Sequence, residues 1–444
     1  MFELAIENGR VYQDGAWTAQ TVYIQDGIIA RISAQKLDAR ERIDAQNKMV
    51  LPGLIDPHVH LAMPAGNGLF SADDFVSGSC AAVHGGITTV IDFTDEATSA
   101  EQLRTFTKKK KALAAESAVD VALHAAMADP QDDPDTVMQT IAELGLCGLK
   151  LYTTYKEGGM YSPYATIERL MQAAARWGVH ILVHAEQDNM LDVSNTVPFC
   201  EHGTARPAQS ETQAVLTLCR MARRYGTKLY IVHISAGSTL LAVQKEYGDL
   251  LGKQLFLESA PHYFCLNDAM LHRADGYRFT MTPPLRSAAE QAILCNHRAM
   301  IDAIGTDHCP FMRAQKEHRY TAEIPMGMGS LSDSFMVMYK RFGDAIIPQY
   351  TENVAKIHGL WGRKGALQPG FDADVVIFDP DAPAEAPGTG SVCDDSMYTV
   401  EQKQGRFCQV FRRGVCLLKD GVYHQEERGK GRYLPVAGTA EERR

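Results

Sequence analysis

Several features that mark particular classes of protein are missing from this 444-residue sequence. No apolar run is long enough to span a bilayer, so no membrane-crossing segment is expected. Basic residues are in the minority, with Lys+Arg 44 against Asp+Glu 54, and the net charge of −10 gives no reason to expect a nucleic-acid or anionic-membrane partner. No Gly-x-Gly-x-x-Gly fingerprint or P-loop opens a helix, which argues against a nucleotide-binding open sheet.

Paired cysteines are also missing. The ten cysteines are scattered from Cys80 to Cys416 without a Cys-x-x-Cys motif, as expected for reduced thiols in a cytosolic enzyme. The opening residues MFELAIENGR carry an acid early and lack a basic stretch followed by an apolar one, so a signal peptide is not expected. The predicted location is the cytoplasm.

The two ends of the chain share a β-rich texture that the middle lacks. Short strand-like runs with Asn-Gly or Asp-Gly turns occur in LAIENGRVY and TVYIQDGIIARIS, and again in DADVVIFDP and FCQVFRRGVCLLKDG. From residue 52 to about 362, apolar strand-like runs alternate with helical stretches. This alternation is typical of repeated βα units around a parallel sheet.

Eight apolar runs can be counted in the middle segment: LPGLIDPHVH, GITTVIDFT, VDVALHAAM, CGLKLYTT, GVHILVHAE, KLYIVHIS, QLFLES and MIDAIGTDH. Eight parallel strands with eight crossovers close into a TIM-type (β/α)8 barrel, whose active site lies at the C-terminal strand ends. A doubly wound open sheet is the competing topology. The absence of its phosphate-binding motifs favours the barrel.

Unusual polar residues gather at the predicted C-terminal strand ends. Each of them alone is more often structural, since a single strand-end His is usually hydrogen-bonded and a single Lys usually reaches the surface. Their joint placement favours one metal site. The set consists of His58 and His60 after the first run, Lys150 inside the fourth, and His184, His233 and Asp307 after the fifth, sixth and eighth.

A lysine among these histidines indicates particular chemistry. Burial lowers the pKa of a lysine and makes its neutral amine available to react with carbon dioxide. The resulting carbamate could bridge two divalent ions, and metal binding lowers the pKa of water from 15.7 to about 7. His58, His60 and Asp307 would hold one ion. His184 and His233 would hold the other. Zinc is the expected metal, with manganese, iron, cobalt and nickel as alternatives.

The remaining histidines lack a comparable placement. His308 follows Asp307 and points the opposite way in an extended segment, so we expect it to support the site or the fold rather than to bind metal. The others are interpreted as structural or surface residues: His84, His124, His180, His202, His262, His272, His297, His318, His358 and His424.

The chain resembles the dihydropyrimidinase/hydantoinase (cyclic amidase) family of the amidohydrolase superfamily. The resemblance is carried by HVHLAMPAGNGLFSADDFVSGSCAAVHGGITTVIDF, GLKLYTTY, HAEQ, TPPLR, IGTDHCPF, NVAKIHGL, GRKGALQPGFDADVVIFDP and GRYLP, and covers essentially the whole chain. It implies a barrel at residues 52–362, a small β-sandwich built from residues 1–51 and 363–425, and a C-terminal tail at 426–444. It also implies a carbamylated Lys150, two metal ions and a homotetramer.

The resemblance further implies substrate contacts. The family's oxyanion-stabilising tyrosine falls on Tyr155, although from the residues alone this side chain could equally be a packing aromatic. Thr282 and Met326 stand where the family has serine and asparagine. At these two positions, family members hold the imide-like edge of the substrate ring mainly with backbone groups. Ala62 replaces a common acid. Dihydroorotases have an arginine shortly after the second histidine that binds the substrate carboxylate. Ala62 and Met63 stand in this segment and cannot bind a carboxylate in that way.

The expected reaction is therefore hydrolytic ring opening of hydantoins or dihydropyrimidines to N-carbamoyl amino acids, with hydantoins slightly ahead. Asp307 is expected to take the proton of the attacking water and deliver it to the departing nitrogen. The alternatives are an allantoinase, another cyclic amide or imide hydrolase, and a non-enzymatic scaffold relative that has lost its metal ligands.

Overall fold

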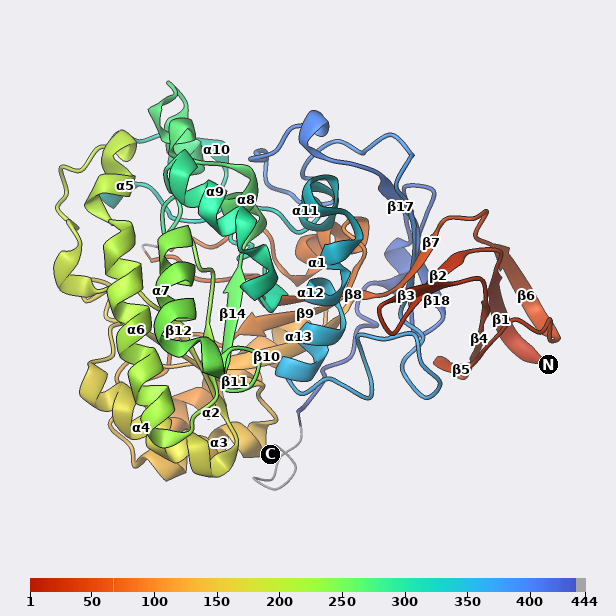
Figure 1. The fold of residues 1–444 in the computed structure, drawn as a ribbon, viewed down its shortest axis with the longest axis horizontal. Coiled ribbons are helices and arrows are strands. Elements are labelled where there is room, and N and C mark those ends of the chain that lie inside the picture. The colour runs from red at the N-terminus through yellow and green to blue at the C-terminus, as the bar shows by residue number, and fades with distance from the viewer. Residues whose placement is uncertain (67, 437–444) are drawn as a thin grey trace.

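The computed structural model describes residues 1–66 and 68–436. It consists of a large barrel and a smaller β-rich part, and the N-terminus lies at the far edge of the β-rich part (Figure 1). Of the predicted tail at 426–444, residues 437–444 lie outside the described residues. No helix in the described chain is long and apolar enough to cross a membrane.

Eight parallel strands form the barrel, and all eight lie within the eight predicted runs. Each strand pairs with the next along the chain, in the order β8 to β15. These strands read as near-continuous apolar runs because both of their faces are buried. Their bounds are β8 Leu54–Val59, β9 Ile87–Phe93, β10 Asp120–Ala126, β11 Gly148–Tyr152, β12 His180–His184, β13 Leu229–Ile231, β14 Leu255–Ser259 and β15 Ala303–Ile304.

The barrel closes through the segments that follow β15. Asp56 on β8 accepts hydrogen bonds from the backbone N–H of His58 (3.0 Å) and of Thr306 (3.1 Å). A parallel bridge then joins Val59 to His308, and the N–H of His60 donates to the carbonyl of His308 at 2.9 Å. A buried carboxylate thus binds the first and last strands together at the end where the predicted site residues lie.

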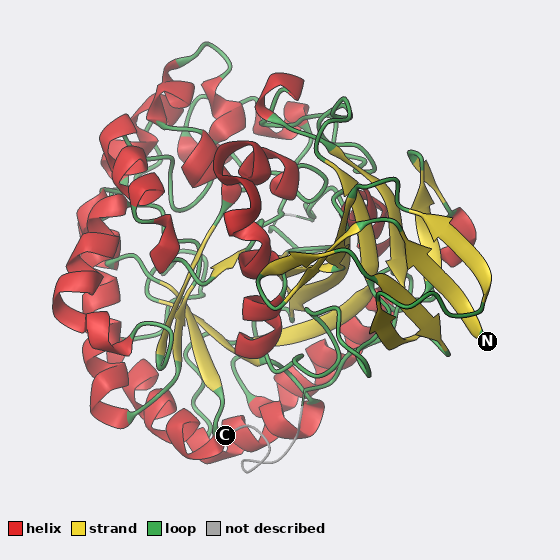
Figure 2. Ribbon diagram, turned by 45° about the vertical axis from the view of Figure 1, so that its right-hand side comes forward, coloured by secondary structure: helices red, strands yellow, loops and turns green. Residues whose placement is uncertain are grey.

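Helices surround this barrel (Figure 2). Their ends follow local rules: α3 begins at the capping side chain of Asp133 with Pro134 in its first turn, and ends at Gly145 with a φ of 67°. The helices are α1 Phe75–His84, α2 Ala100–Ala114, α3 Pro134–Leu144, α4 Tyr164–Trp177, α5 His202–Ala205, α6 Ala208–Tyr225, α7 Gly237–Tyr247, α8 Pro261–Cys265, α9 Ala288–Asn296, α10 Arg313–Lys316, α11 Ser334–Phe342, α12 Ile347–Tyr350 and α13 Glu352–Ile357.

Both ends of the chain build the β-rich part. A four-stranded sheet has the order β5-β4-β1-β6, and a seven-stranded sheet has the order β19-β18-β17-β16-β7-β2-β3. The two ends meet where β7 pairs antiparallel with β16, with Leu51 opposite Val376. The bounds are β1 Phe2–Glu7, β2 Arg10–Gln13, β3 Ala16–Thr18, β4 Thr21–Gln25, β5 Ile28–Ser33, β6 Ala39–Asp44, β7 Met49–Pro52, β16 Val375–Asp379, β17 Arg406–Arg412, β18 Val415–Lys419 and β19 Val422–Tyr423.

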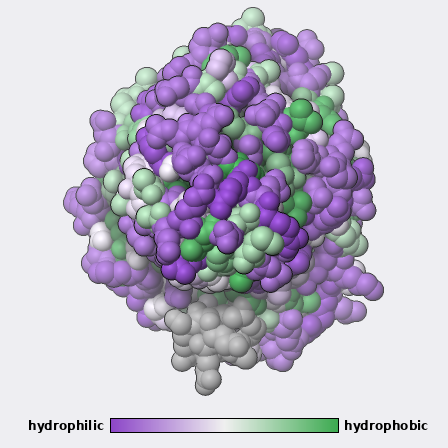
Figure 3. Space-filling model, turned by 90° about the vertical axis from the view of Figure 1, so that its right-hand side faces the viewer, coloured by the Kyte–Doolittle hydropathy of each residue, from purple (hydrophilic) through white to green (hydrophobic). Residues whose placement is uncertain are grey.

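The predicted fold class, a (β/α)8 barrel with a small β-sandwich from both termini, is confirmed. One hydrophobic core joins Leu4 and Ile6 of the first strand to Val375 and Phe411 from the far end of the sequence. On the face at the sandwich end of the molecule, hydrophobic residues form only small areas separated by hydrophilic ones (Figure 3). The boundaries at residues 51/52 and 362/363 stay predictions.

A buried ion cluster joins the sandwich to the N-terminal end of the barrel. Lys364 Nζ lies 2.7 Å from carboxylate oxygens of Asp120, at the start of β10, and of Asp374, and 2.9 Å from Asp372. Arg413 pairs with Asp120 as well. Because the lysine side chain is only 1% exposed, its charge is compensated by these carboxylates rather than by water.

Candidate metal centre

All nine residues predicted for the site line one cavity of about 570 Å³. They come from different elements but share the C-terminal ends of the strands, as expected for this fold. Four are on or directly after β8, β11 and β12, and the others follow β11, β13 and β15 or lie in later loops. They are His58, His60, Lys150, Tyr155, His184, His233, Thr282, Asp307 and Met326.

One group of possible metal ligands consists of His58, His60 and Asp307. The Nε2 atoms of the two histidines lie 3.2 Å apart, and each lies close to Oδ1 of Asp307, at 3.3 Å and 3.1 Å. A metal with bonds of about 2.0–2.2 Å to nitrogen and oxygen needs ligand atoms at about this spacing. Alternation along β8 places both rings on one face, as the His-x-His spacing predicts.

A second group consists of His184 and His233. Nδ1 of His184 lies 3.0 Å from Nε2 of His233. Burial lowers the pKa of both rings, so both stay neutral near pH 7 and each keeps one nitrogen able to bind a metal. Both rings also lie in the cavity that contains the first group.

Left-handed backbone at the strand ends aims several of these side chains. His233, Asp307 and Tyr155 have φ values of 37°, 50° and 69°, a region that non-glycine residues rarely adopt. At His233 the conformation is supported by its own N–H, which donates to Glu258 at 3.0 Å. Such backbone strain is characteristic of functional sites.

Buried carboxylates fix the orientation of the histidines from behind. Nδ1 of His58 lies 2.7 Å from Glu258, and Nε2 of His184 lies 2.8 Å from Glu186. Each contact keeps the other ring nitrogen free for the cavity. Glu186 is held in turn by Arg206 at 2.5 Å. The sequence gives no sign of these supporting residues, because a glutamate in a loop or strand carries no signal without its spatial partner.

Lys150 lies on β11 and is 2% exposed. Its ammonium nitrogen lies over the rings of Phe93 and Tyr152, at 5.3 Å and 5.4 Å from their centroids, and it has no ion pair among the described residues. Burial lowers the pKa of Lys150 to about 8, against the opposing charges of Asp307 and Glu258. The amine is therefore partly neutral near pH 7, as the carbamate hypothesis requires.

Tyr155 projects into the cavity beside the second histidine group, with its ring centroid 4.8 Å from that of His184. The guanidinium carbon of Arg206 lies 5.4 Å from the same ring. Burial raises the pKa of Tyr155, while Arg206 and the Thr282 hydroxyl act in the opposite direction, so the phenol stays protonated and can donate a hydrogen bond. Met326 also lines the cavity, whereas Ala62 does not.

Glu96 lines the cavity although it was not among the predicted site residues. It follows β9 on the same barrel rim, and the hydroxyl of Tyr152 donates to it at 3.4 Å. The available signal was its position two residues after the predicted run GITTVIDFT. Asp95 and Glu101 lie nearby in the sequence, and the sequence alone does not distinguish Glu96 from these two acids.

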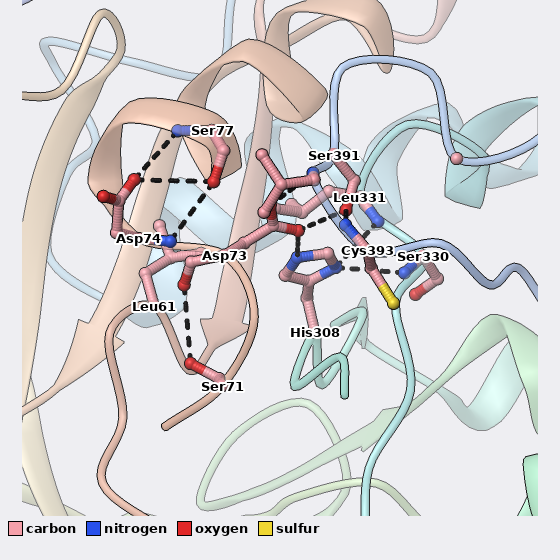
Figure 4. A network of polar contacts seen from close by, with 12 residues as sticks. Leu61, Ser71, Asp73, Asp74, Ser77, His308, Ser330, Leu331, Ser391 and Cys393 are labelled. Carbon is pink, nitrogen blue, oxygen red and sulfur yellow. Dashed lines mark hydrogen bonds and ion pairs between the residues drawn. The ribbon is translucent and has the colours of Figure 1, made fainter. Parts of the chain in front are cut away.

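His308 belongs to a polar network with Asp73 and Ser330 (Figure 4), and it is not among the residues that line the cavity. Its Nδ1 accepts hydrogen bonds from the backbone N–H of Ser330 (3.0 Å) and Leu331 (3.4 Å), which places the ring proton on Nε2, 2.9 Å from Asp73. Asp73 also accepts the hydroxyl of Ser391 at 2.5 Å. The network anchors the backbone next to Asp307, which matches the supporting role expected for His308.

Comparison with known proteins agrees with this architecture. The chain is 30% identical over 445 residues to a D-hydantoinase of Streptomyces coelicolor, with 94% of each chain covered. It is 30% identical over 405 residues to a D-hydantoinase of Geobacillus stearothermophilus, with 84% of each covered. A solved dihydropyrimidinase structure from Brevibacillus agri has a TM-score of 0.89 and 26% identity, covering 98% of this chain and 99% of that one. Residues 49–416 match the Amidohydrolase family, and the chain belongs to that family.

Proposed function

We propose that this protein is a binuclear metal-dependent hydrolase that opens cyclic ureides, hydantoins and dihydropyrimidines, to N-carbamoyl amino acids. The observation that carries the proposal is the arrangement of two sets of ligand atoms, His58–His60–Asp307 and His184–His233, around Lys150 in one cavity. The relatives named D-hydantoinase and dihydropyrimidinase support the substrate class.

The donor set fits two divalent ions. Neutral imidazoles and one carboxylate suit zinc, and also manganese, iron, cobalt or nickel. A carbamate on Lys150 would supply the oxygen ligands that an ammonium group cannot. When bound, the ions would lower the pKa of water to near 7 and act as Lewis acids on the ring carbonyl.

The chain's own residues would manage protons and charge. Asp307 faces the cavity with its side chain 18% exposed, so its carboxylate can reach a water proton there and carry it to the departing ring nitrogen. The protonated phenol of Tyr155 would donate a hydrogen bond to the carbonyl oxygen as negative charge develops on it. Because Arg206 lies against Tyr155 and pairs with Glu186, the phenol and the His184 ring are positioned by one set of contacts.

Uncharged rings fit this cavity better than rings that carry a carboxylate. Glu96 puts a negative charge at the rim, and no arginine lines the cavity among the described residues. Backbone groups at Thr282 and Met326 would hold the imide-like edge of the ring, so the side-chain changes at these positions leave that contact intact. Allantoin is the alternative substrate. A scaffold role is disfavoured because all six ligand positions are filled.

The direct test measures the activity of zinc-loaded protein on a panel of substrates by the loss of the ring amide absorbance. The panel contains hydantoin, both enantiomers of 5-substituted hydantoins, dihydrouracil, allantoin and dihydroorotate. We expect turnover of hydantoins and dihydrouracil and little of dihydroorotate. Turnover of allantoin or dihydroorotate far above every hydantoin and dihydropyrimidine would show that the substrate class is wrong. A homotetramer and a cytoplasmic location remain part of the proposal.

A further inference from the structure

Three histidines meet in the barrel interior, outside the cavity. His124 is on β10, His180 begins β12, and His358 follows α13. Each of them offers one ligand atom within 4.8 Å of the others. Nε2 of His180 lies 3.2 Å from Nδ1 of His358, and the ring centroids of His124 and His358 are 5.0 Å apart.

The strand register places this cluster in a layer of its own below the candidate metal centre. Gly148 on β11 pairs with His180 on β12, and Ala125, next to His124, pairs with Leu149. His180 is four residues before His184, or about 13 Å along the strand at the usual rise of about 3.3 Å per residue. The ring of Phe93 separates the layers: its centroid lies 5.0 Å from that of His60 and 5.2 Å from that of His124.

The cluster contains buried polar atoms without a partner. Both ring nitrogens of His124, and Nε2 of His358, have no hydrogen-bond partner among the described residues, although the two side chains are 0% and 1% exposed. A buried polar group without a partner destabilises the fold, so three such atoms in one cluster call for a ligand.

The cluster packs closely against the backbone of β11. Gly148 lies between His124 and His180 in the sheet, and a Cβ atom there would come within 2.7 Å of His180 Nε2. Burial lowers the pKa of His124 and His358 well below the usual range, so these rings are neutral and can bind a metal. The ring of Tyr230 packs against the cluster, with its centroid 4.9 Å from that of His358, while its hydroxyl donates to Glu258 at 2.8 Å.

We propose that His124, His180 and His358 form a separate, buried metal site that holds one divalent transition-metal ion such as zinc. Three imidazoles are a ligand set that zinc, copper and nickel accept. Ligand nitrogens at about 2.0–2.1 Å from an ion lie about 3.3–3.6 Å apart, close to the His180–His358 distance, and the ligand atom of His124 lies within 4.8 Å of the other two. The ion would link β10 and β12 to the segment after α13 and stabilise the barrel.

The test uses the full chain with Lys150→Ala and Asp307→Ala, which disable the centre in the cavity. This double variant is produced in zinc-supplemented medium, because the cluster is buried, and is then dialysed against a chelator. Metal analysis should find about one zinc per chain. Adding His358→Phe should abolish this zinc, whereas His262→Phe should retain it. His262 is the matched control because it is also buried with both ring nitrogens unpartnered, yet it belongs to no such group of possible ligands.

Zinc X-ray absorption of the double variant gives a second readout that needs no further substitution at the cluster. We expect three imidazole nitrogens at about 2.0–2.1 Å. Loss of this zinc should also lower the melting temperature of the double variant. A double variant without zinc, zinc that survives His358→Phe, or scattering from fewer than three imidazoles would each overturn the proposal. Because the cavity centre is disabled throughout, these outcomes are independent of the proposed reaction.

Discussion

Carbamate formation at Lys150 should depend on pH in a way that the structure specifies. Burial lowers the pKa of Lys150 to about 8, whereas an ordinary lysine has a pKa of about 10.4. Only the neutral amine reacts with carbon dioxide. From the lowered pKa, its fraction is about 1% at pH 6, about 9% at pH 7, about 50% at pH 8 and about 90% at pH 9.

These fractions set the expected rates. At a fixed concentration of dissolved carbon dioxide, the initial rate of carbamate formation should rise about fivefold from pH 7 to 8 and less than twofold from pH 8 to 9. An unshifted lysine would instead gain about tenfold at each of these steps. The histidines add little to this profile, because burial lowers the pKa of His58, His184 and His233 and keeps their rings neutral throughout the range.

The assay starts from metal-free protein that has lost its carbamate at low pH. Carbon-13-labelled carbon dioxide is supplied at pH 6, 7, 8 and 9, and the carbamate carbon is followed by NMR before zinc is added. Lys150→Arg is the control and should lack the Lys150 signal, leaving only the carbamates of other amines. A tenfold rise between pH 8 and 9, or no loss of signal in Lys150→Arg, would refute the reasoning.

Four further substitutions test other parts of the account. Asp307→Asn should reduce turnover by about 10²–10⁴-fold through loss of proton transfer; metal content must be measured with it, and near-normal turnover with both ions bound would rule this role out. Tyr155→Phe keeps the ring against His184 and should reduce kcat by about 10²–10³-fold, so an unchanged kcat would reduce the phenol to a packing group. Glu96→Gln removes a negative charge from the cavity rim and should raise kcat/KM for dihydroorotate relative to dihydrouracil; an unchanged ratio would contradict this. Lys364→Met leaves buried carboxylates uncompensated and should lower the free energy of unfolding, measured in urea, by about 3–5 kcal/mol. Lys356→Met, at an exposed ion pair, is the control and should lower it by at most about 1 kcal/mol. Equal effects would mean that the buried cluster does not stabilise the contact between sandwich and barrel.

The sequence predicts the barrel well for a physical reason. Strands buried on both faces must be apolar along their whole length, so the eight runs stand out against helices with one polar face. Lys150 is conspicuous in such a run, and the strand-end histidines follow the same logic. The joining of the two chain ends was expected only from the family resemblance, because the pairing of β7 with β16 leaves no local signal in either strand.

The parts that could not be predicted depend on side chains that meet across the fold. Glu258 and Glu186 acquire their roles only through contacts with His58 and His184. His124, His180 and His358 were interpreted one by one as structural or surface residues. Their proximity arises from strand register and from a chain segment about 180 residues further along. Sequence spacing does not encode such distances.

A crystal structure of the zinc-loaded protein, with anomalous differences measured at the zinc edge, tests the central claim most directly. The account predicts two zinc peaks in the cavity: one bound by His58, His60 and Asp307, the other by His184 and His233, with added density at the end of Lys150 between them. A single cavity peak on His58, His60 and Asp307, with an unmodified amine at Lys150, would contradict the binuclear centre.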